Sequence, residues 1–327
     1  MRKHEPVLDL ESITLSAFAK RRRMGLKPMS IRLEMLQVAR LAPKLLGEST
    51  QLVSWFLRQQ QNSDGGFKDR TGRSDLYYTV FGIDGLLALQ AELPGDQIGH
   101  YLDRFGNGEG LDFVHLCCLA RCHGALTNHY HKGGGPSVAP NLAARIESFR
   151  SDDGGYNPRQ RSSSGTAYGA FLALDALQNL GCSIIEPLRL VQSLKLLETS
   201  DGAWTNSREG QSAVGSTNAT AAASTILRHL QMPVNASVAD WLWARRHVQG
   251  GFLAAPSAPM PDLLSTATTL HALSGMQRDL TPLKESCLDF IDTLWTSDGG
   301  FHGNWSDDVV DCEYTFYGLL SLGHLSL

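Results

Sequence analysis

The sequence predicts an all-α fold in which pairs of helices close into a ring. Three observations predict it. A glycine turn followed by an aromatic residue recurs along the chain, the segment before each turn has the pattern of an amphipathic helix, and the segment after it is apolar on nearly all sides. A helix that is apolar all round belongs inside a fold, so inner helices ringed by outer ones form an α/α toroid. No strand pattern competes with this interpretation.

The glycine turns set the period of the chain. The clear copies read SDGGF, DDGGY, SDGAW, QGGF and SDGGF, and the last three intervals between their aromatic residues are 48, 48 and 49 residues. The first interval is 89 residues, close to two repeats, and RFGNGEG at 104–110 supplies a degenerate copy between. Six repeats are therefore expected. The five clear turns end at Phe67, Tyr156, Trp204, Phe252 and Phe301.

Each repeat contributes one outer and one inner helix. Outer helices are expected at 50–61, 96–105, 141–150, 186–198, 238–247 and 282–295. Inner helices are expected at 74–89, 111–126, 165–177, 218–230, 262–273 and 311–325. The predicted organisation is thus a helical extension over residues 1–48 that packs on a toroid over residues 49–327.

The inner helices begin with residues that favour helix N-caps. Aligning these helices on their leucine-rich ends places one such residue at the same position in all six, and a second set lies one turn later on the same face. If the N-termini surround one mouth of the ring, the second set lines its throat. The expected caps are Asp75, Asp112, Thr166, Asn218, Asp262 and Asp311, and the throat residues are Tyr78, His115, Gly169, Ala221, Ser265 and Tyr314.

Composition restricts the classes of partner. The chain has 327 residues and a formal net charge of -4, which gives no general attraction to nucleic acid or to an anionic bilayer. Its six cysteines lie mostly within apolar helical segments, as expected for reduced thiols in the cytoplasm. No segment has about 18 uninterrupted apolar residues, so no transmembrane helix is predicted.

The repeated turn and inner helix resemble the prenyltransferase and squalene-oxidase repeat, which is shared by protein prenyltransferase β subunits and class II terpene cyclases. The resemblance covers the chain from about residue 50 to its end and implies the same toroid. It is closer to the β subunit of Rab geranylgeranyltransferase, whose last inner helix has an Asp-x-x-His-Thr-x-x-Gly pattern like residues 311–318 here. This likeness implies an isoprenoid-handling protein that binds a prenyl diphosphate.

The resemblance fails at the zinc site. In that family the histidine and an Asp-x-Cys on the preceding inner helix hold zinc, whereas this chain has Tyr314 and Leu264 at the histidine and cysteine positions and retains Asp262. Zinc needs about four close ligands. We therefore expect no zinc cofactor, although the clustered acids leave Mg²⁺ open.

The resemblance to class II terpene cyclases fails at a different residue. Those enzymes protonate an alkene with the middle acid of an Asp-x-Asp-Asp-Thr-Ala motif, and residues 262–267 fit its frame with leucine at the position of the acid. If the protein is a cyclase, its acid lies elsewhere. Three functions remain open: a zinc-free prenyltransferase-like protein, a cyclase with an atypical acid, and a non-catalytic toroid that binds a lipid or a partner.

Acids at the last inner helix are the first candidates for chemistry. Glu313 begins an apolar helix and is expected to be a buried general acid. Asp311 is expected chiefly to cap this helix and is the second candidate acid, with Tyr314 beside it. Asp307 and Asp308 are expected to be solvated. His115 shares a helical stripe with Cys118 and Cys122, which fits either a displaced metal site or core packing.

Arginines in the turns are candidates for binding a diphosphate, because the planar guanidinium group suits phosphate. Arg70, Arg73, Arg159 and Arg161 are expected on one arc of the rim, with the acids on the opposite arc. Small residues on the third and fourth inner helices face tyrosines of the first and last, which predicts a tapered apolar cavity for an isoprenoid tail beside Tyr78, Tyr168 and Tyr314. The basic N-terminal segment is expected to cap the toroid or to dock a helical partner resembling an α subunit.

Overall fold

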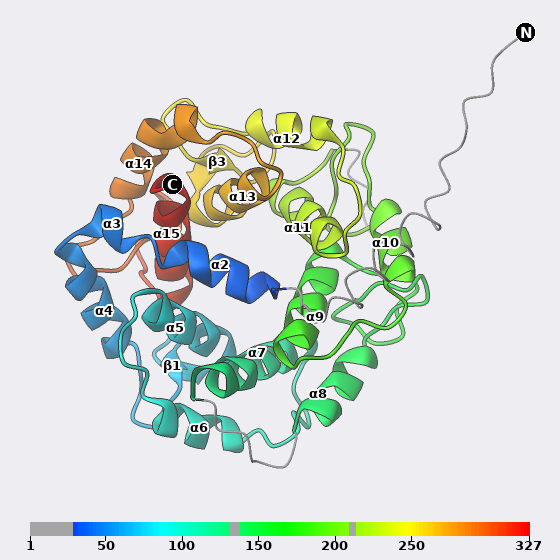
Figure 1. Ribbon diagram of the computed structural model, residues 1–327, viewed down its shortest axis with the longest axis horizontal. Helices are drawn as coiled ribbons and strands as arrows, with labels where there is room; N and C mark the ends of the chain where they lie inside the picture. Colours follow the sequence, from blue (N-terminus) through cyan, green and yellow to red (C-terminus); the bar gives the residue numbers. More distant parts are fainter. Residues whose placement is uncertain (1–28, 131–137, 209–213) are drawn as a thin grey trace, which may run out of the picture.

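The computed structural model describes residues 29–130, 138–208 and 214–327, and the basic segment up to residue 28 lies outside these ranges. Its inner helices form a closed ring, because each packs against the next and α15 packs against α5 (Figure 1). This confirms the predicted α/α toroid. The inner helices are α5 (Leu76–Ala88), α7 (Phe113–Tyr130), α9 (Ala167–Asn179), α11 (Thr217–His229), α13 (Leu263–Gly275) and α15 (Cys312–Leu325).

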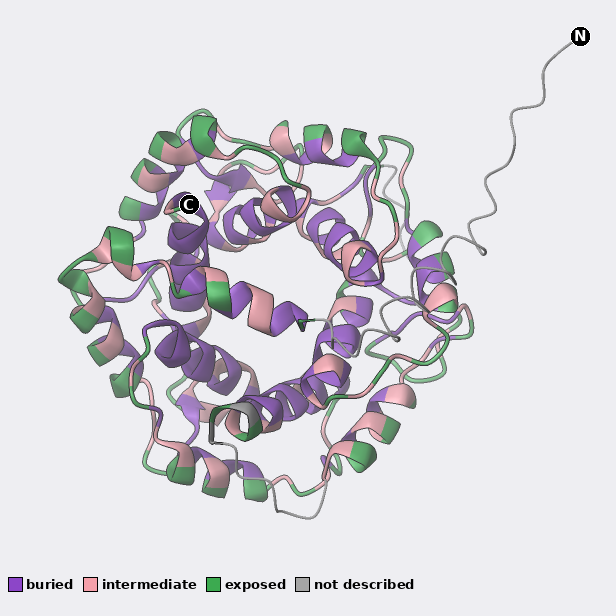
Figure 2. Ribbon diagram, viewed as in Figure 1, coloured by how far each residue is buried: buried purple, intermediate pink, exposed green. Residues whose placement is uncertain are grey.

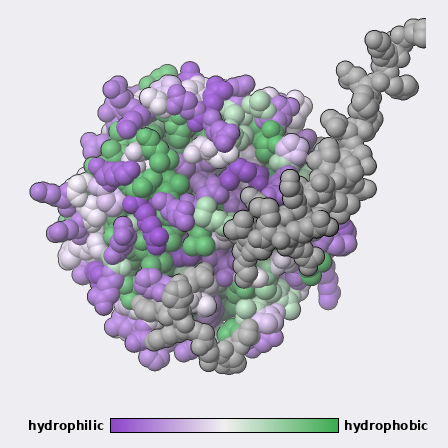
Figure 3. Space-filling view, in the orientation of Figure 1, coloured by the Kyte–Doolittle hydropathy of each residue, from purple (hydrophilic) through white to green (hydrophobic). Residues whose placement is uncertain are grey.

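The outer helices surround this ring. Each turns one apolar stripe inward and a polar face outward, whereas the inner helices are buried over most of their surface (Figure 2). In the space-filling view, apolar and polar residues are intermingled outside the part covered by grey atoms (Figure 3). The outer helices are α4 (Ser49–Gln59), α6 (Gly95–Asp103), α8 (Val138–Glu147), α10 (Pro187–Lys195), α12 (Ala236–Trp243) and α14 (Lys284–Asp292).

The glycine turn forms the same backbone bridge in all five clear repeats. Its aromatic residue is buried and forms an antiparallel bridge with the residue six positions earlier, as in Gln61 with Phe67. A glycine with positive φ, such as Gly65 at 95°, precedes it. In the first repeat the aromatic ring packs on Gly82 of α5, where an added Cβ would lie 2.2 Å from Phe67. The turn therefore fixes each outer helix against its inner helix.

A threonine of the inner helix completes the turn in four repeats. The Phe67 amide donates to Thr79 Oγ1 over 3.0 Å, and the Phe252 amide donates to Thr266 Oγ1 over the same distance. In each case the threonine lies four residues after the N-cap. The other two such bonds join Trp204 to Thr220 and Phe301 to Thr315.

Five of the six expected N-caps are confirmed, and the fourth is wrong. Ser216, not Asn218, caps α11: its hydroxyl accepts the Ala219 amide over 3.4 Å. The alignment on leucine-rich ends misplaced this helix by two residues, because its end lacks the small residue present in the others. Asn218 therefore lies inside the first turn, and Ala219 replaces Ala221 in the throat set.

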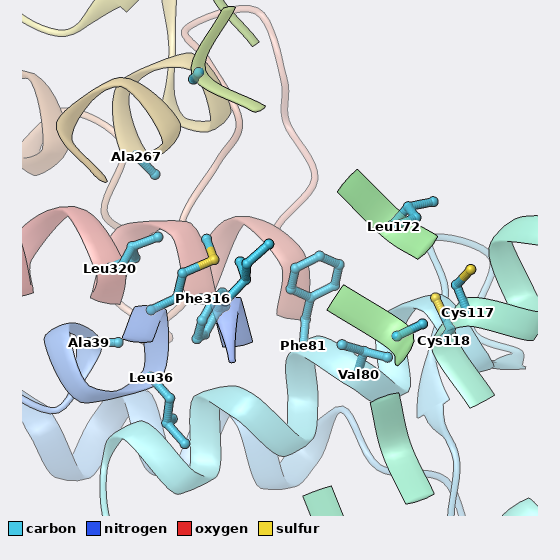
Figure 4. Close-up of a cluster of buried hydrophobic side chains, with 14 of the residues drawn as sticks. Leu36, Ala39, Val80, Phe81, Cys117, Cys118, Leu172, Ala267, Phe316 and Leu320 are labelled. Atoms are coloured by element: carbon cyan, nitrogen blue, oxygen red, sulfur yellow. The ribbon is translucent and has the colours of Figure 1, made fainter. Parts of the chain in front are cut away.

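Helix α2 (Ile31–Ala39) lies across the middle of the ring and packs on α5, α9 and α15 (Figure 1). Its Ala39 lies near Leu320 of α15, whereas the Leu36 side chain points away from α15 (Figure 4). A buried ion pair also holds α2 against α5, since Arg32 Nε lies 2.6 Å from Asp84 Oδ1. The short helix α3 (Pro43–Leu46) then leads to α4. The domain boundary at residues 48 and 49 stays a prediction.

Strands are confined to two short antiparallel pairs in the described part of the chain. They are β1 (Phe67–Lys68) with β2 (Ser74–Asp75), and β3 (Phe252–Leu253) with β4 (Pro261–Asp262). All six cysteines are free thiols. No described helix has the length and apolar character needed to cross a membrane.

Candidate active site in the toroid cavity

A cavity of about 270 Å³ lies inside the ring, between the rim formed by the N-termini of the inner helices and α2. Tyr168 is 40% exposed at the rim, whereas Met35 of α2 closes the inner end. Four aromatic residues and a stretch of alanines supply most of the wall, as the sequence predicts for a tapered apolar space. The lining residues are Met35, Tyr77, Tyr168, Phe171, Asn206, Ser216, Asn218, Ala219, Ala221, Ala222, Thr225, Leu264, Thr268, His271, Glu313 and Tyr317.

Glu313 is the one carboxylate among the described residues that line this cavity. It lies in the first turn of α15, where the N-cap Asp311 sets the start of the helix. The Tyr77 hydroxyl of α5 donates a hydrogen bond to Glu313 Oε1 over 2.6 Å. The first and last inner helices thus meet at an acid that faces an apolar space.

Burial raises the pKa of Glu313 to about 7, with a smaller contribution in the same direction from the nearby Asp311 carboxylate. The Tyr77 hydrogen bond and the Arg70 charge act in the opposite direction. Near neutral pH this acid is present in both protonation states. It can therefore deliver a proton into the cavity and remain as a carboxylate that Tyr77 stabilises.

An aromatic cluster continues from Tyr77 toward the interior. The Tyr77 and Phe81 rings meet edge to face at 5.1 Å between centroids, and the Phe81 and Tyr317 rings are 5.5 Å apart. Their electron-rich faces can stabilise a positive charge that develops nearby. The structure confirms Tyr168 as a lining residue. The prediction is wrong for Tyr78 and Tyr314, whose neighbours Tyr77 and Tyr317 occupy the wall.

Arg70 is paired with acids. Its Nε donates to Asp311 Oδ2 over 2.9 Å, and its Nη2 lies 2.8 Å from Asp307 Oδ2. The guanidinium group also lies 5.4 Å from the centre of the Tyr314 ring. The expected separation of arginines and acids on opposite arcs is therefore wrong, because ring closure places the first and last repeats side by side.

The remaining predicted arginines are exposed. The Arg73 side chain is 81% exposed, and its Nε donates to Thr71 Oγ1 over 3.0 Å. Arg159 and Arg161 lie in the exposed loop before α9. These side chains are outside the residues that line the cavity. Their role in binding a diphosphate stays a prediction.

His115 joins two N-caps at the rim. Its Nδ1 lies 2.8 Å from Asp112 Oδ2, and its Nε2 lies 3.0 Å from Asp75 Oδ2. The hydrogen bond with Asp75, together with the second carboxylate, raises the pKa of His115 to about 9. This imidazolium holds α5 to α7. His115 is not among the residues that line the cavity, and Cys118 and Cys122 of the same stripe are buried in the core.

The acids at the family's zinc position have other partners. Asp262 accepts the Ser265 amide over 2.7 Å and the Ser265 hydroxyl over 2.8 Å, while Asp311 binds Arg70 and the Tyr314 amide. With Leu264 and Tyr314 in place of cysteine and histidine, these residues do not fit zinc. Within the described ranges, no three His, Cys, Asp or Glu side chains form a group that could hold a metal ion.

A polar group on α11 and α13 was not predicted from the sequence. Asn218 of α11 lies 2.8 Å from Thr268 Oγ1 and 3.3 Å from Ser265 Oγ, both of α13. Asn218 and Thr268 line the cavity. The misplaced cap concealed Asn218. The threonine that lies four residues after the cap in four repeats would have corrected the alignment, because Thr220 assigns the cap to Ser216.

Comparisons with known proteins agree with this architecture. No curated protein matches the chain significantly. A similar solved structure is the type II terpene cyclase MstE from Scytonema, a single-residue variant in complex with geranylgeranyl dihydroxybenzoate, at 13% identity and a TM-score of 0.59 over 87% of this chain and 97% of that chain. Protein geranylgeranyltransferase-I of Candida albicans, complexed with GGPP, is 15% identical with a TM-score of 0.54 over 95% and 90%. These likenesses show the fold alone.

A family model describes the toroid directly. The model for the prenyltransferase alpha-alpha toroid domain matches residues 33–128, 136–233 and 219–326. Together these matches span nearly all of the ring and include part of α2. With six inner helices closed around a cavity, and a bridged turn between the outer and inner helix of five pairs, the chain belongs to the prenyltransferase alpha-alpha toroid domain family.

Proposed function

We propose that the protein binds an isoprenoid in the toroid cavity and that Glu313 protonates it, starting a cyclisation of the class II type. The observation that carries this proposal is the position of Glu313, a carboxyl group with a pKa of about 7 that faces an apolar, aromatic-lined cavity and accepts a hydrogen bond from Tyr77. The similar cyclase and transferase are described with geranylgeranyl compounds, which supports an isoprenoid ligand.

The chemistry requires three properties of the site. The acid must be protonated when the substrate arrives, and burial favours that state. Its proton adds to one carbon of an alkene, so the π electrons form the new C–H bond and leave a carbocation on the other carbon. Tyr77, Tyr168 and Tyr317 can stabilise this cation, and the apolar wall limits its capture by water.

Proton return completes the reaction. Ring closure transfers the positive charge along the chain of the substrate, and loss of a proton from a neighbouring carbon restores an alkene. No diphosphate has to leave in this sequence. This suits a cavity in which none of the described lining residues is lysine or arginine.

Binding of a prenyl diphosphate on the rim is the prenyltransferase-like alternative. Arg159 and Arg161 are exposed in the loop that precedes α9. The dipole of a helix favours an anion at its N-terminus. Arg70 supports this alternative less, since Asp307 and Asp311 already neutralise it. An α-subunit-like partner belongs to the same alternative.

The test incubates the purified protein with acyclic C15 and C20 isoprenoids and identifies products by mass spectrometry. We expect cyclic isomers from the wild type and none from Glu313→Gln, because the amide keeps the shape and cannot supply the proton. Asp308→Asn is the matched control, since Asp308 is an exposed acid in the preceding loop. Turnover by Glu313→Gln at the wild-type rate would remove Glu313 as the acid. Binding without turnover in the wild type would indicate a binding toroid.

A further inference from the structure

We propose that Asn218, with Thr268 and Ser265, forms a subsite for a neutral oxygen function, so that the cavity takes an oxygenated isoprenoid such as an alcohol, an ether or a carbonyl compound. This inference rests on the proposed binding of an isoprenoid in the cavity. It adds the class of substrate, which the position of Glu313 alone does not define.

The subsite is a small hydrogen-bonded group between two inner helices. Asn218 lies in the first turn of α11, Thr268 lies in the second turn of α13, and Ser265 is buried behind them. Thr268 Oγ1 is 2.8 Å from Asn218 Oδ1 and 2.8 Å from the Leu264 carbonyl oxygen. Ser265 Oγ also donates to Asp262 Oδ2 over 2.8 Å. The contacts fix the Asn218 amide at the cavity wall.

The amide retains hydrogen-bonding capacity for a ligand. A primary amide has two N–H donors and an oxygen with two lone pairs. Thr268 has one hydroxyl hydrogen, which it donates either to Asn218 or to the Leu264 carbonyl oxygen. In either orientation of the amide, the bonds to Thr268 and Ser265 leave Asn218 with one N–H and with lone-pair capacity on its oxygen. It can therefore donate to an ether or carbonyl oxygen, or both donate to and accept from a hydroxyl.

The charges of the cavity exclude an anionic head group. The ionisable lining residues in the described part of the chain are Glu313, His271 and three tyrosines. His271 is neutral near pH 7, because burial lowers its pKa to about 4. An ionised diphosphate would find no cation on the wall and would face the Glu313 carboxyl group. A neutral oxygen function meets no such penalty, whereas a hydrocarbon would leave the Asn218 amide without a partner.

The test compares three probes with the same C15 chain: farnesol, farnesene and farnesyl diphosphate. Dissociation constants are measured by calorimetry on the full chain. We expect the wild type to bind farnesol about ten-fold more tightly than farnesene, and the diphosphate most weakly. Asn218→Leu should bring the farnesol and farnesene constants to within about two-fold of each other by weakening farnesol alone.

A second substitution tests the subsite in case Asn218→Leu does not fold. Thr268→Val is isosteric and removes the hydroxyl that orients Asn218, so it should reduce the preference for farnesol several-fold. Thr50→Val is the matched control: it makes the same chemical change on the outer helix α4, at a residue that does not line the cavity, and should leave the preference unchanged. Unfolding midpoints of all variants confirm that each is folded.

Three outcomes would overturn the subsite. They are equal binding of farnesol and farnesene by the wild type, equal weakening of both by Asn218→Leu, and tightest binding of the diphosphate. The first two leave the proposed acid chemistry intact, because the turnover test of Glu313→Gln does not depend on the head group. Failure of all three probes to bind would contradict the isoprenoid cavity itself, and the subsite with it.

Discussion

The Tyr77 hydroxyl donates to Glu313 Oε1 over 2.6 Å and joins the first inner helix to the last. The two residues are 236 positions apart in the chain and meet only because α15 packs against α5. The bond stabilises the carboxylate that remains after Glu313 gives up its proton. Closure of the ring therefore brings the acid and its hydrogen-bond donor together from the last and first inner helices.

Replacing Tyr77 by Phe should raise the pKa of Glu313 further, since the lost hydrogen bond favours the charged form. The limb of the rate profile that depends on a protonated acid should then move to higher pH, and the maximum rate should fall because the acid is weaker. Turnover measured against pH checks this prediction. Tyr78→Phe is the control, because Tyr78 interacts with Glu313 only through charge and lacks the hydrogen bond that Tyr77 makes. An equal change in that variant would refute the argument.

The raised pKa of Glu313 should also make folding stability depend on pH. A carboxyl group whose pKa is higher in the folded chain than in the unfolded one binds its proton more tightly when folded. Its contribution is present below the unfolded value of about 4.5 and is lost as the pH rises through about 7. We expect the free energy of unfolding of the wild type to fall by about 1–3 kcal/mol relative to Glu313→Gln over this interval. Urea denaturation measures these free energies. The same difference between the wild type and Glu313→Gln at both ends of the interval would contradict the prediction.

Asp311 should behave as a structural residue. Its Oδ1 accepts the Tyr314 amide over 2.9 Å, so Asp311→Ala should lower the free energy of unfolding by about 0.5–2 kcal/mol through loss of the cap. Asp311→Asn should keep most of the free energy of unfolding that Asp311→Ala loses, although it weakens the ion pair with Arg70. Denaturant unfolding of the three proteins measures the effect. A loss of turnover in Asp311→Asn at unchanged stability would assign Asp311 to the chemistry.

The purified protein should bind no stoichiometric zinc through Asp262 and Asp311. Leucine and tyrosine stand at two of the positions where the related transferases have ligands, and both aspartates already accept hydrogen bonds from their own helices. Elemental analysis after purification without chelators provides the measurement. One zinc per chain that disappears in Asp262→Ala would show that the prediction is wrong.

The fold could be predicted from the sequence because its signals are local and repeated. A glycine turn, an aromatic residue and an apolar helix recur at nearly constant spacing, and errors in one copy are corrected by the others. The misplaced cap of α11 is informative. Leucine-rich ends tolerate small shifts, whereas the threonine that bonds the preceding turn lies at a fixed distance from the cap.

The site could be predicted only in part, because its geometry depends on closure of the ring. Glu313 was found from its place at the start of an apolar helix. Its partner Tyr77 and the pairing of Arg70 with Asp311 depend on contacts between the first and last repeats, which spacing within one repeat does not report. The one-residue error between Tyr78 and Tyr77 has a similar origin, since the inward direction on a helix turns by 100° per residue.

The proton that Glu313 transfers to the substrate can be traced by deuterium labelling. An acyclic isoprenoid that the protein converts is incubated in heavy water, and the product is examined by mass spectrometry and NMR. Protonation by Glu313, which exchanges with solvent, predicts one carbon-bound deuterium at the alkene carbon where cyclisation begins, and no product from Glu313→Gln. A product without carbon-bound deuterium, or one formed equally by Glu313→Gln, would contradict the central claim that this acid starts the reaction.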